Sequence, residues 1–118
     1  MPEPNYMTPA GARAARAELL SCTDEGRIRE LTDHLATAQI IEPPDDRGTA
    51  SLGATVVIEE TSGRRTTYQI VGALEADPRH GRVFWQSPIA EALYGARVGD
   101  TVTLPRGSEA EILAIDYT

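Results

Sequence analysis

The sequence has no lysine, one cysteine, two histidines and few aromatic residues (one Trp, four Tyr and one Phe). The single cysteine, Cys22, excludes a disulfide within the chain, and with only His34 and His80 beside it we expect no structural zinc site. No apolar run approaches the roughly 18 residues that a membrane span needs. The first residues show neither the basic nor the apolar segment of a secretory signal. We therefore expect a soluble, cytoplasmic protein.

Positive charge is also scarce. The 118 residues carry 11 basic side chains, all of them arginine, against 18 acidic ones, and the net charge is −7. A protein that binds nucleic acid by covering phosphates, or that attaches to an anionic membrane, needs a basic face. The acidity argues against both classes and leaves a protein partner open. The length suits one small domain, or one domain with an appendage.

The N-terminal part is predicted to be helical. Thr8 can cap a helix and Pro9 suits its first position. The alanine-rich stretch that follows, up to Leu20, favours a helix, although Gly11 is expected to weaken its first turn. After a break at residues 21–23, Thr23 is expected to cap a second helix, with Asp24 in its first turn.

The second helix carries an apolar row with heptad spacing. Its members are Ile28, Leu31, Leu35 and Ala38. Two rows of the first helix could face it: Ala14, Ala17 and Leu20, or Ala12, Ala15 and Leu19. The pattern predicts a short antiparallel hairpin. Helices of about 13 to 16 residues reach only about 20–24 Å.

The C-terminal part has the alternation of strands. Five are predicted, at residues 54–58, 66–71, 82–86, 101–104 and 110–117. Between the third and fourth, Ser87 caps a short helix that begins at Pro88, buries Ile89, Ala90, Leu93 and Tyr94 on one face and stops at Gly95. The fold class is therefore α+β: residues 1–47 form a hairpin and a Pro-rich linker that begins at residue 42, and residues 48–118 form a mostly antiparallel sheet with one helix.

Few side chains suggest chemistry. Asp24 and Glu25 at the hairpin tip could share a Mg²⁺ ion with another protein's active site, although their spacing alone favours interaction with the helix dipole. A surface turn is expected for His80, because no nucleophile motif accompanies it. Cys22 is expected to be a small, exposed loop residue, with a reactive thiol at a helix start as the alternative.

One aromatic pair is also notable. Phe84 and Trp85 are adjacent in a predicted strand, so they should point to opposite faces. One of them is expected to lie in the core, and the other is either covered by the helical part or exposed for a partner.

Several stretches, in the same order along the chain, resemble the Gre family of bacterial transcript-cleavage factors (GreA and GreB). They are YMTPAG (6–11), GRIREL (26–31) with AQII (38–41), SPIAEALYG (87–95) with VGDTV (98–102), and AEILAIDY (110–117). The short hairpin is also similar to the nucleoside diphosphate kinase regulator (Rnk) branch, which carries a short coiled coil on the same C-terminal domain.

The resemblance implies an N-terminal antiparallel coiled coil and a C-terminal FKBP-like domain. In the family, the C-terminal domain docks at the rim of the RNA polymerase secondary channel. The coiled coil carries acidic tip residues to the catalytic Mg²⁺, where they help to hold a second Mg²⁺ and the water that cleaves backtracked RNA. The resemblance also implies that Ser87, Pro88 and Ile89 contact RNA polymerase, while helix capping and core packing are their alternative roles.

The sequence departs from the family between Leu20 and Gly26, where a long segment with the acidic loop is missing. A rod of about 20 Å has about half the usual reach, and catalysis tolerates misplacement of only about an ångström. We therefore expect a non-enzymatic, cofactor-free regulator that binds RNA polymerase as a monomer or weak homodimer and does not stimulate cleavage. Three alternatives stay open: residual cleavage through Asp24 and Glu25, an FKBP-like interaction module or prolyl isomerase, and dimerisation through exposed Leu19 and Leu20.

Overall fold

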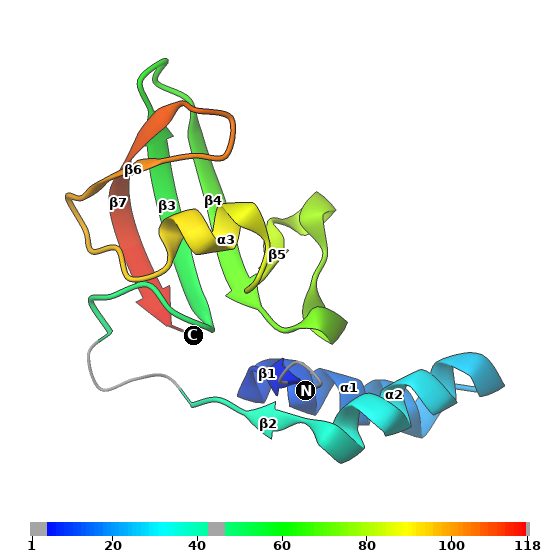
Figure 1. Ribbon diagram of the computed structural model, residues 1–118. Helices are drawn as coiled ribbons and strands as arrows, with labels where there is room; N and C mark the ends of the chain where they lie inside the picture. Colours follow the sequence, from blue (N-terminus) through cyan, green and yellow to red (C-terminus); the bar gives the residue numbers. More distant parts are fainter. Residues whose placement is uncertain (1–4, 43–46, 118) are drawn as a thin grey trace.

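The computed structural model describes residues 5–42 and 47–117, which form two parts (Figure 1). Two helices, α1 (Pro9–Ser21) and α2 (Glu25–Thr37), make the hairpin, and a five-stranded sheet with one helix across its face makes the C-terminal part. The α+β fold class is confirmed. Part of the expected linker, residues 43–46, lies outside the described residues. No helix of residues 5–42 and 47–117 is long and apolar enough to cross a membrane.

Capping residues set where the two helices begin. Thr8 caps α1 as predicted, and its side-chain oxygen accepts a hydrogen bond from the Gly11 backbone N–H at 3.0 Å. The predicted cap of α2 is wrong, because Asp24 and not Thr23 occupies that position. The Asp24 carboxylate accepts hydrogen bonds from backbone N–H groups of the first turn of α2. Its negative charge also interacts favourably with the positive end of the helix dipole.

One of the two possible rows on α1 faces α2. Ala12 and Ala15 are buried, and Leu31 is the buried residue of α2. Leu19, which shares their face, is half-buried, whereas Leu20 on the other row is 92% exposed. The alanines let the two helices approach closely, but they leave the hairpin with a small apolar core.

A short parallel pairing closes the base of the hairpin. β1 (Tyr6–Met7) pairs with β2 (Gln39–Ile40). Beside it, the Asn5 side chain donates hydrogen bonds to the His34 carbonyl at 2.8 Å and to Thr37 Oγ1 at 2.9 Å. This pairing could not be predicted from the sequence, because runs of two residues carry no periodicity. The entry and exit of the hairpin are therefore fixed side by side.

The sheet has the order β5-β4-β3-β7-β6. Its strands are β3 (Ala54–Glu60), β4 (Arg65–Val71), β5 (Arg82–Phe84), β6 (Thr101–Thr103) and β7 (Glu109–Tyr117). Neighbouring strands are antiparallel except for β4 and β5, which are parallel. The predicted strands are present, but β5 ends at Phe84 instead of residue 86. Two 3₁₀ turns, η1 (Ala73–Glu75) and η2 (Pro78–His80), connect β4 to β5.

The helix α3 (Pro88–Leu93) crosses one face of the sheet (Figure 1). Ala90 and Leu93 are fully buried in the apolar cluster between helix and sheet. Tyr94 was predicted to share this buried face, which is wrong: it follows the helix end and is 50% exposed. Gly95, with φ of 83°, then turns the chain away, as expected for a residue that ends a helix.

Candidate functional site

The predicted functional residues lie in two separate places. Asp24 and Glu25 are at the free end of the hairpin, whereas Ser87, Pro88 and Ile89 are at the start of α3 on the C-terminal part (Figure 1). Nothing brings the two groups together into one site.

At the hairpin tip, the Asp24 carboxylate is engaged by its own helix. Its Oδ1 accepts from Gly26 N at 2.9 Å and from Arg27 N at 3.3 Å. Glu25 is exposed. Cys22 is half-buried at the end of α1 and its Sγ lies 3.8 Å from the Asp24 carbonyl oxygen. Asp24 thus serves as a cap, and Glu25 is the acidic residue of the pair that is left exposed at the tip.

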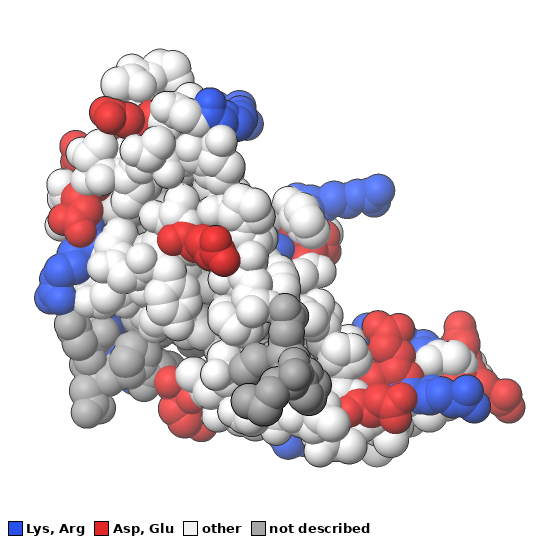
Figure 2. Space-filling view, viewed as in Figure 1, with Lys and Arg blue, Asp and Glu red and all other residues white. Residues whose placement is uncertain are grey.

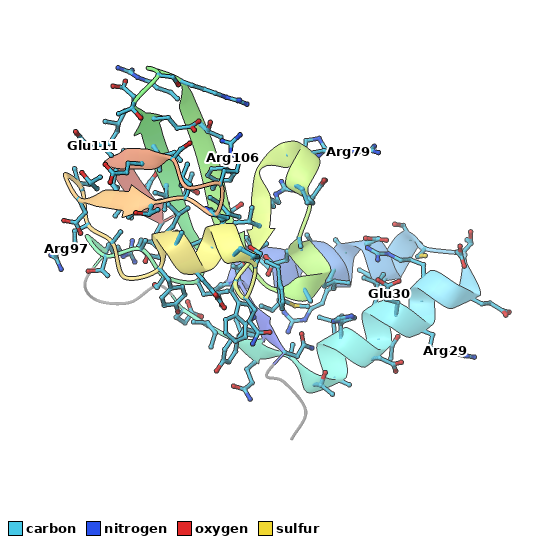
Figure 3. The ribbon with its side chains drawn as sticks, turned by 45° about the horizontal axis from the view of Figure 1, so that its top comes forward. Arg29, Glu30, Arg79, Arg97, Arg106 and Glu111 are labelled. Carbon is cyan, nitrogen blue, oxygen red and sulfur yellow. The ribbon has the colours of Figure 1, made fainter. Side chains whose placement is uncertain are left out.

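Opposite charges alternate along the end of the hairpin (Figure 2). Arg27 binds both carboxylate oxygens of Glu18, with Nε 2.6 Å from Oε2, and reaches Glu30 at 3.0 Å. This two-pronged hydrogen bond lowers the pKa of Glu18 and raises that of Arg27. Arg29 points away from the hairpin (Figure 3). The charge near the tip is therefore mixed, and Arg27 is paired with Glu18 and Glu30.

At the start of α3, the three predicted contact residues differ in exposure. Ser87 is half-buried, and its hydroxyl oxygen accepts from Ala90 N at 3.3 Å as the helix cap. Ile89 is half-buried and packs against the core. Pro88 is exposed. In Figure 2 the surface around α3 is white apart from an acidic group over the helix, and α3 carries the exposed Glu91 in its first turn. Pro88 is accordingly the residue of the three with the most side chain available to a partner.

The two histidines form no catalytic site within the described residues. His80 Nδ1 lies 2.5 Å from Asp77 Oδ2 at the surface, and this contact lowers the pKa of Asp77. No serine or cysteine in residues 5–42 or 47–117 hydrogen-bonds to His80. His34 is half-buried between the hairpin and η1, and no group of three His, Cys, Asp or Glu side chains that could hold a metal occurs in the same described ranges.

The aromatic pair does not alternate across the sheet as predicted. β5 ends at Phe84, so the strand geometry does not extend to Trp85. Both rings are half-buried and lie edge to face, with centroids 5.9 Å apart. The Trp85 ring also packs against the Tyr6 ring, with the two centroids 5.0 Å apart. This contact connects the C-terminal part to the base of the hairpin.

Glu75 makes a second connection between the two parts, and this residue was not among the predicted functional residues. Its carboxylate accepts from the Thr8 backbone N–H at 2.9 Å, from the Thr8 hydroxyl, and from Gly72 N at 3.3 Å. A Cβ at Gly11 would lie 2.0 Å from Glu75 Oε1. The glycine that was expected only to weaken α1 therefore makes room for this carboxylate. The sequence held one sign of this contact: a glycine in the first turn of an alanine-rich helix indicates that another group packs closely there.

Beyond this base the two parts separate. A cleft of about 840 Å³ lies between the hairpin and the β4–β5 connection, with Glu18, Arg27 and His34 on one wall and Asp77 and Arg82 on the other. The hairpin is thus attached to the C-terminal part at its base, and its tip projects freely (Figure 1).

Comparisons with known proteins agree with this two-part architecture. Residues 44–117 match the family model "Transcription elongation factor, GreA/GreB, C-term". Transcription elongation factor GreA of Alkalilimnicola ehrlichii is 46% identical over 100 residues, which are 80% of this chain and 63% of that protein. GreA of Rhodospirillum rubrum is 48% identical over 89 residues, which are 72% of this chain and 57% of that protein. The chain thus spans less than two thirds of the length of these relatives.

Solved structures give the same fold. The chain superimposes on GreA factor homolog 1 of Thermus thermophilus with a TM-score of 0.54 and 25% identity, covering 97% of this chain and 99% of that one. For GreA/GreB from Nitrosomonas europaea the TM-score is 0.54 at 20% identity, with 98% and 100% covered, which supports the fold alone. By its matched C-terminal part and its relatives, the chain belongs to the GreA/GreB family of transcription elongation factors.

Proposed function

We propose that this protein is a non-catalytic regulator of transcription elongation. It binds RNA polymerase in the cytoplasm, at the rim of the secondary channel, through the face around Ser87, Pro88 and Ile89. It does not stimulate transcript cleavage. It works as a bound factor that needs no cofactor of its own.

Membership of the family supports the binding half of the proposal. The match covers residues 44–117, which include the whole sheet and α3, and the relatives are transcription elongation factors by name. Pro88 is exposed at the start of α3 and is therefore available to a partner, with Glu91 as the charged residue of the same helix. The C-terminal part is therefore the docking part.

The length of the hairpin is the observation that supports the second part of the proposal, that the protein does not stimulate transcript cleavage. α1 and α2 have 13 residues each and are joined by three residues at the tip. At about 1.5 Å per residue, each helix is about 20 Å long, about half the reach that the family resemblance implies. Asp24 uses its carboxylate as a helix cap, and Arg27 neutralises Glu18 nearby. Glu25 is left as the exposed carboxylate of the pair, and the short reach does not favour its delivery as a Mg²⁺ ligand.

Binding is tested by pull-down of purified core RNA polymerase with the tagged full chain. We expect stoichiometric capture, competition by a full-length GreA, and weaker capture by Pro88→Ala. Absence of capture by the unsubstituted protein at moderate salt contradicts the proposal.

Cleavage is tested on stalled, backtracked elongation complexes. We expect RNA of unchanged length with this protein and shortened RNA with a full-length GreA in the same assay. If RNA is shortened, the double variant Asp24→Ala/Glu25→Ala decides whether these carboxylates are responsible, and cleavage lost in that variant establishes residual catalytic support instead.

A further inference from the structure

A pocket of about 280 Å³ lies beside the start of α3. It is lined by Arg64, Thr66, Tyr68, Ile89, Leu104, Pro105 and Arg106. These residues come from the start of β4, the first turn of α3 and the connection between β6 and β7. We name this set the β4 pocket. It adjoins the predicted docking residues, because Ile89 belongs to both.

The pocket exists because α3 runs across the strands and so covers only part of its face of the sheet (Figure 1). A helix with its side chains is about 10–12 Å wide, whereas the seven residues of β4 span about 23 Å. Alternation along the strand places Arg64, Thr66 and Tyr68 on the same face as buried Ile70. α3 covers this face near Ile70 and leaves the part nearer Arg64 open.

The floor of the pocket is apolar and its rim is basic. Leu104 is 3% exposed, and Ile89 and Tyr68 are half-buried. The two charged lining residues, Arg64 and Arg106, are exposed. No acidic side chain lines the pocket, although the whole chain carries a net charge of −7.

The two arginines are differently held. Arg106 contacts Glu60 at 3.1 Å, with the arginine side chain 65% exposed and the Glu60 side chain 10% exposed. This ion pair orients one guanidinium nitrogen and leaves other donors of the fork directed outward. The Arg64 side chain makes no ion pair or side-chain hydrogen bond within the described residues. Arg106 projects above α3 (Figure 3).

We propose that the β4 pocket receives one apolar side chain from a segment of RNA polymerase that carries carboxylates beside it. Arg64 and Arg106 bind these carboxylates. The inference rests on the docking proposed above and names the chemistry of the partner segment. The volume lies below the range of about 300–1,000 Å³ typical of small-molecule sites, and it fits a side chain. Arginine is the residue best shaped for two-pronged binding of a carboxylate.

The test measures binding of core RNA polymerase to the full-length chain by biolayer interferometry at two salt concentrations. Arg64→Glu alters an exposed side chain, and we expect it to weaken binding about fivefold; together with Arg106→Gln the loss is about tenfold and falls mainly on the association rate. Arg79→Glu is the matched charge control, because Arg79 is exposed on η2, away from the pocket (Figure 3).

A second pair of variants tests the cavity without changing charge. Thr66→Trp fills the pocket and is expected to weaken binding, whereas Thr67→Trp places the same ring on the opposite, exposed face of β4 and leaves binding unchanged. Circular dichroism establishes that each variant is folded before it is compared.

The outcomes separate this inference from the proposed function. If the unsubstituted chain does not bind polymerase, both fail. If it binds and all four single variants bind equally well, the pocket inference is overturned while docking stands. If the chain binds a labelled single-stranded RNA that Arg64→Glu releases, and polymerase binding is unchanged, the occupant is nucleic acid and the inference is wrong. Loss with Arg64→Glu and Thr66→Trp alone supports it.

Discussion

The apolar core lies in the C-terminal part, where residues of β3, β4, β7 and α3 form one buried cluster, whereas the helices of the hairpin bury only Ala12, Ala15 and Leu31. The two parts also differ in how they are held. The central strand β3 is hydrogen-bonded to a neighbouring strand on both sides, whereas the hairpin is attached at its base through Glu75 and Trp85. The C-terminal part thus has an apolar core of its own, whereas the hairpin is stabilised by contacts at its base.

The largest effect is expected from the sheet. Ile58→Ala removes a fully buried side chain at the centre of β3 and should lower the free energy of unfolding by about 2–5 kcal/mol. If the hairpin depends on the sheet, both parts unfold together. Thermal denaturation followed by far-UV circular dichroism and by Trp85 fluorescence should give one coincident, lowered midpoint. Separate transitions would contradict the dependence.

Leu31→Ala should act on the hairpin and leave the sheet intact. Leu31 is the largest fully buried side chain of the two helices, and its loss costs about 2–3 kcal/mol within a cluster that can partly relax. Hydrogen exchange should accelerate in α1 and α2 and stay slow in β3 and β7. Equal acceleration in the strands would show that the two parts are one cooperative unit in both directions.

Two substitutions should weaken the contact between Glu75 and the start of α1 to a similar extent. Glu75→Gln removes the charge from three hydrogen bonds, and Gly11→Ala places a Cβ where the carboxylate lies, so each should cost about 1–3 kcal/mol. Distances between spin labels at the hairpin tip and on β7 should broaden in both variants. The double variant should cost little more than either single one, because both remove the same contact.

Substitutions at the hairpin tip should lower stability less, and they should distinguish the capping residue Asp24 from its neighbour Thr23. Asp24→Ala removes the cap of α2 and is expected to cost about 0.5–2 kcal/mol. Thr23→Ala, the matched control, should change stability by less than about 0.5 kcal/mol. Helix content measured by circular dichroism compares them. Equal loss in both variants would restore Thr23 as a capping residue.

The smallest effect is the pH dependence of the Glu18–Arg27 pair. The pKa of Glu18 is lowered in the folded chain, so its contribution is present above the ordinary glutamate pKa of about 4.3 and disappears as the pH falls through the lower folded value. NMR of the Arg27 Nε–H should report this loss below about pH 4. In Glu18→Gln the same resonance should not titrate in that window.

The same contrast explains what could be predicted from the sequence. Helices, hairpin strands and the Ser87 cap were predictable because each rests on neighbours along the chain. Contacts between distant residues were not: Thr8 and Glu75 are 67 positions apart, and nothing local pairs them. Asp24 was missed as the cap because two adjacent residues both suit that position, and Phe84 and Trp85 were misplaced because β5 ends one residue earlier than the apolar run.

The parallel pairing of β1 and β2 has a consequence for how such an arm can change length. Because the pairing and Glu75 fix both ends of the hairpin, residues can be added to or removed from α1 and α2 in equal number without moving the base. Seven residues on each arm would move the tip by about 10 Å and preserve the facing row. The hairpin can therefore vary in length while its base stays fixed. A series of variants with hairpins of increasing length would measure how far the tip must extend from the C-terminal part to have an effect on RNA polymerase.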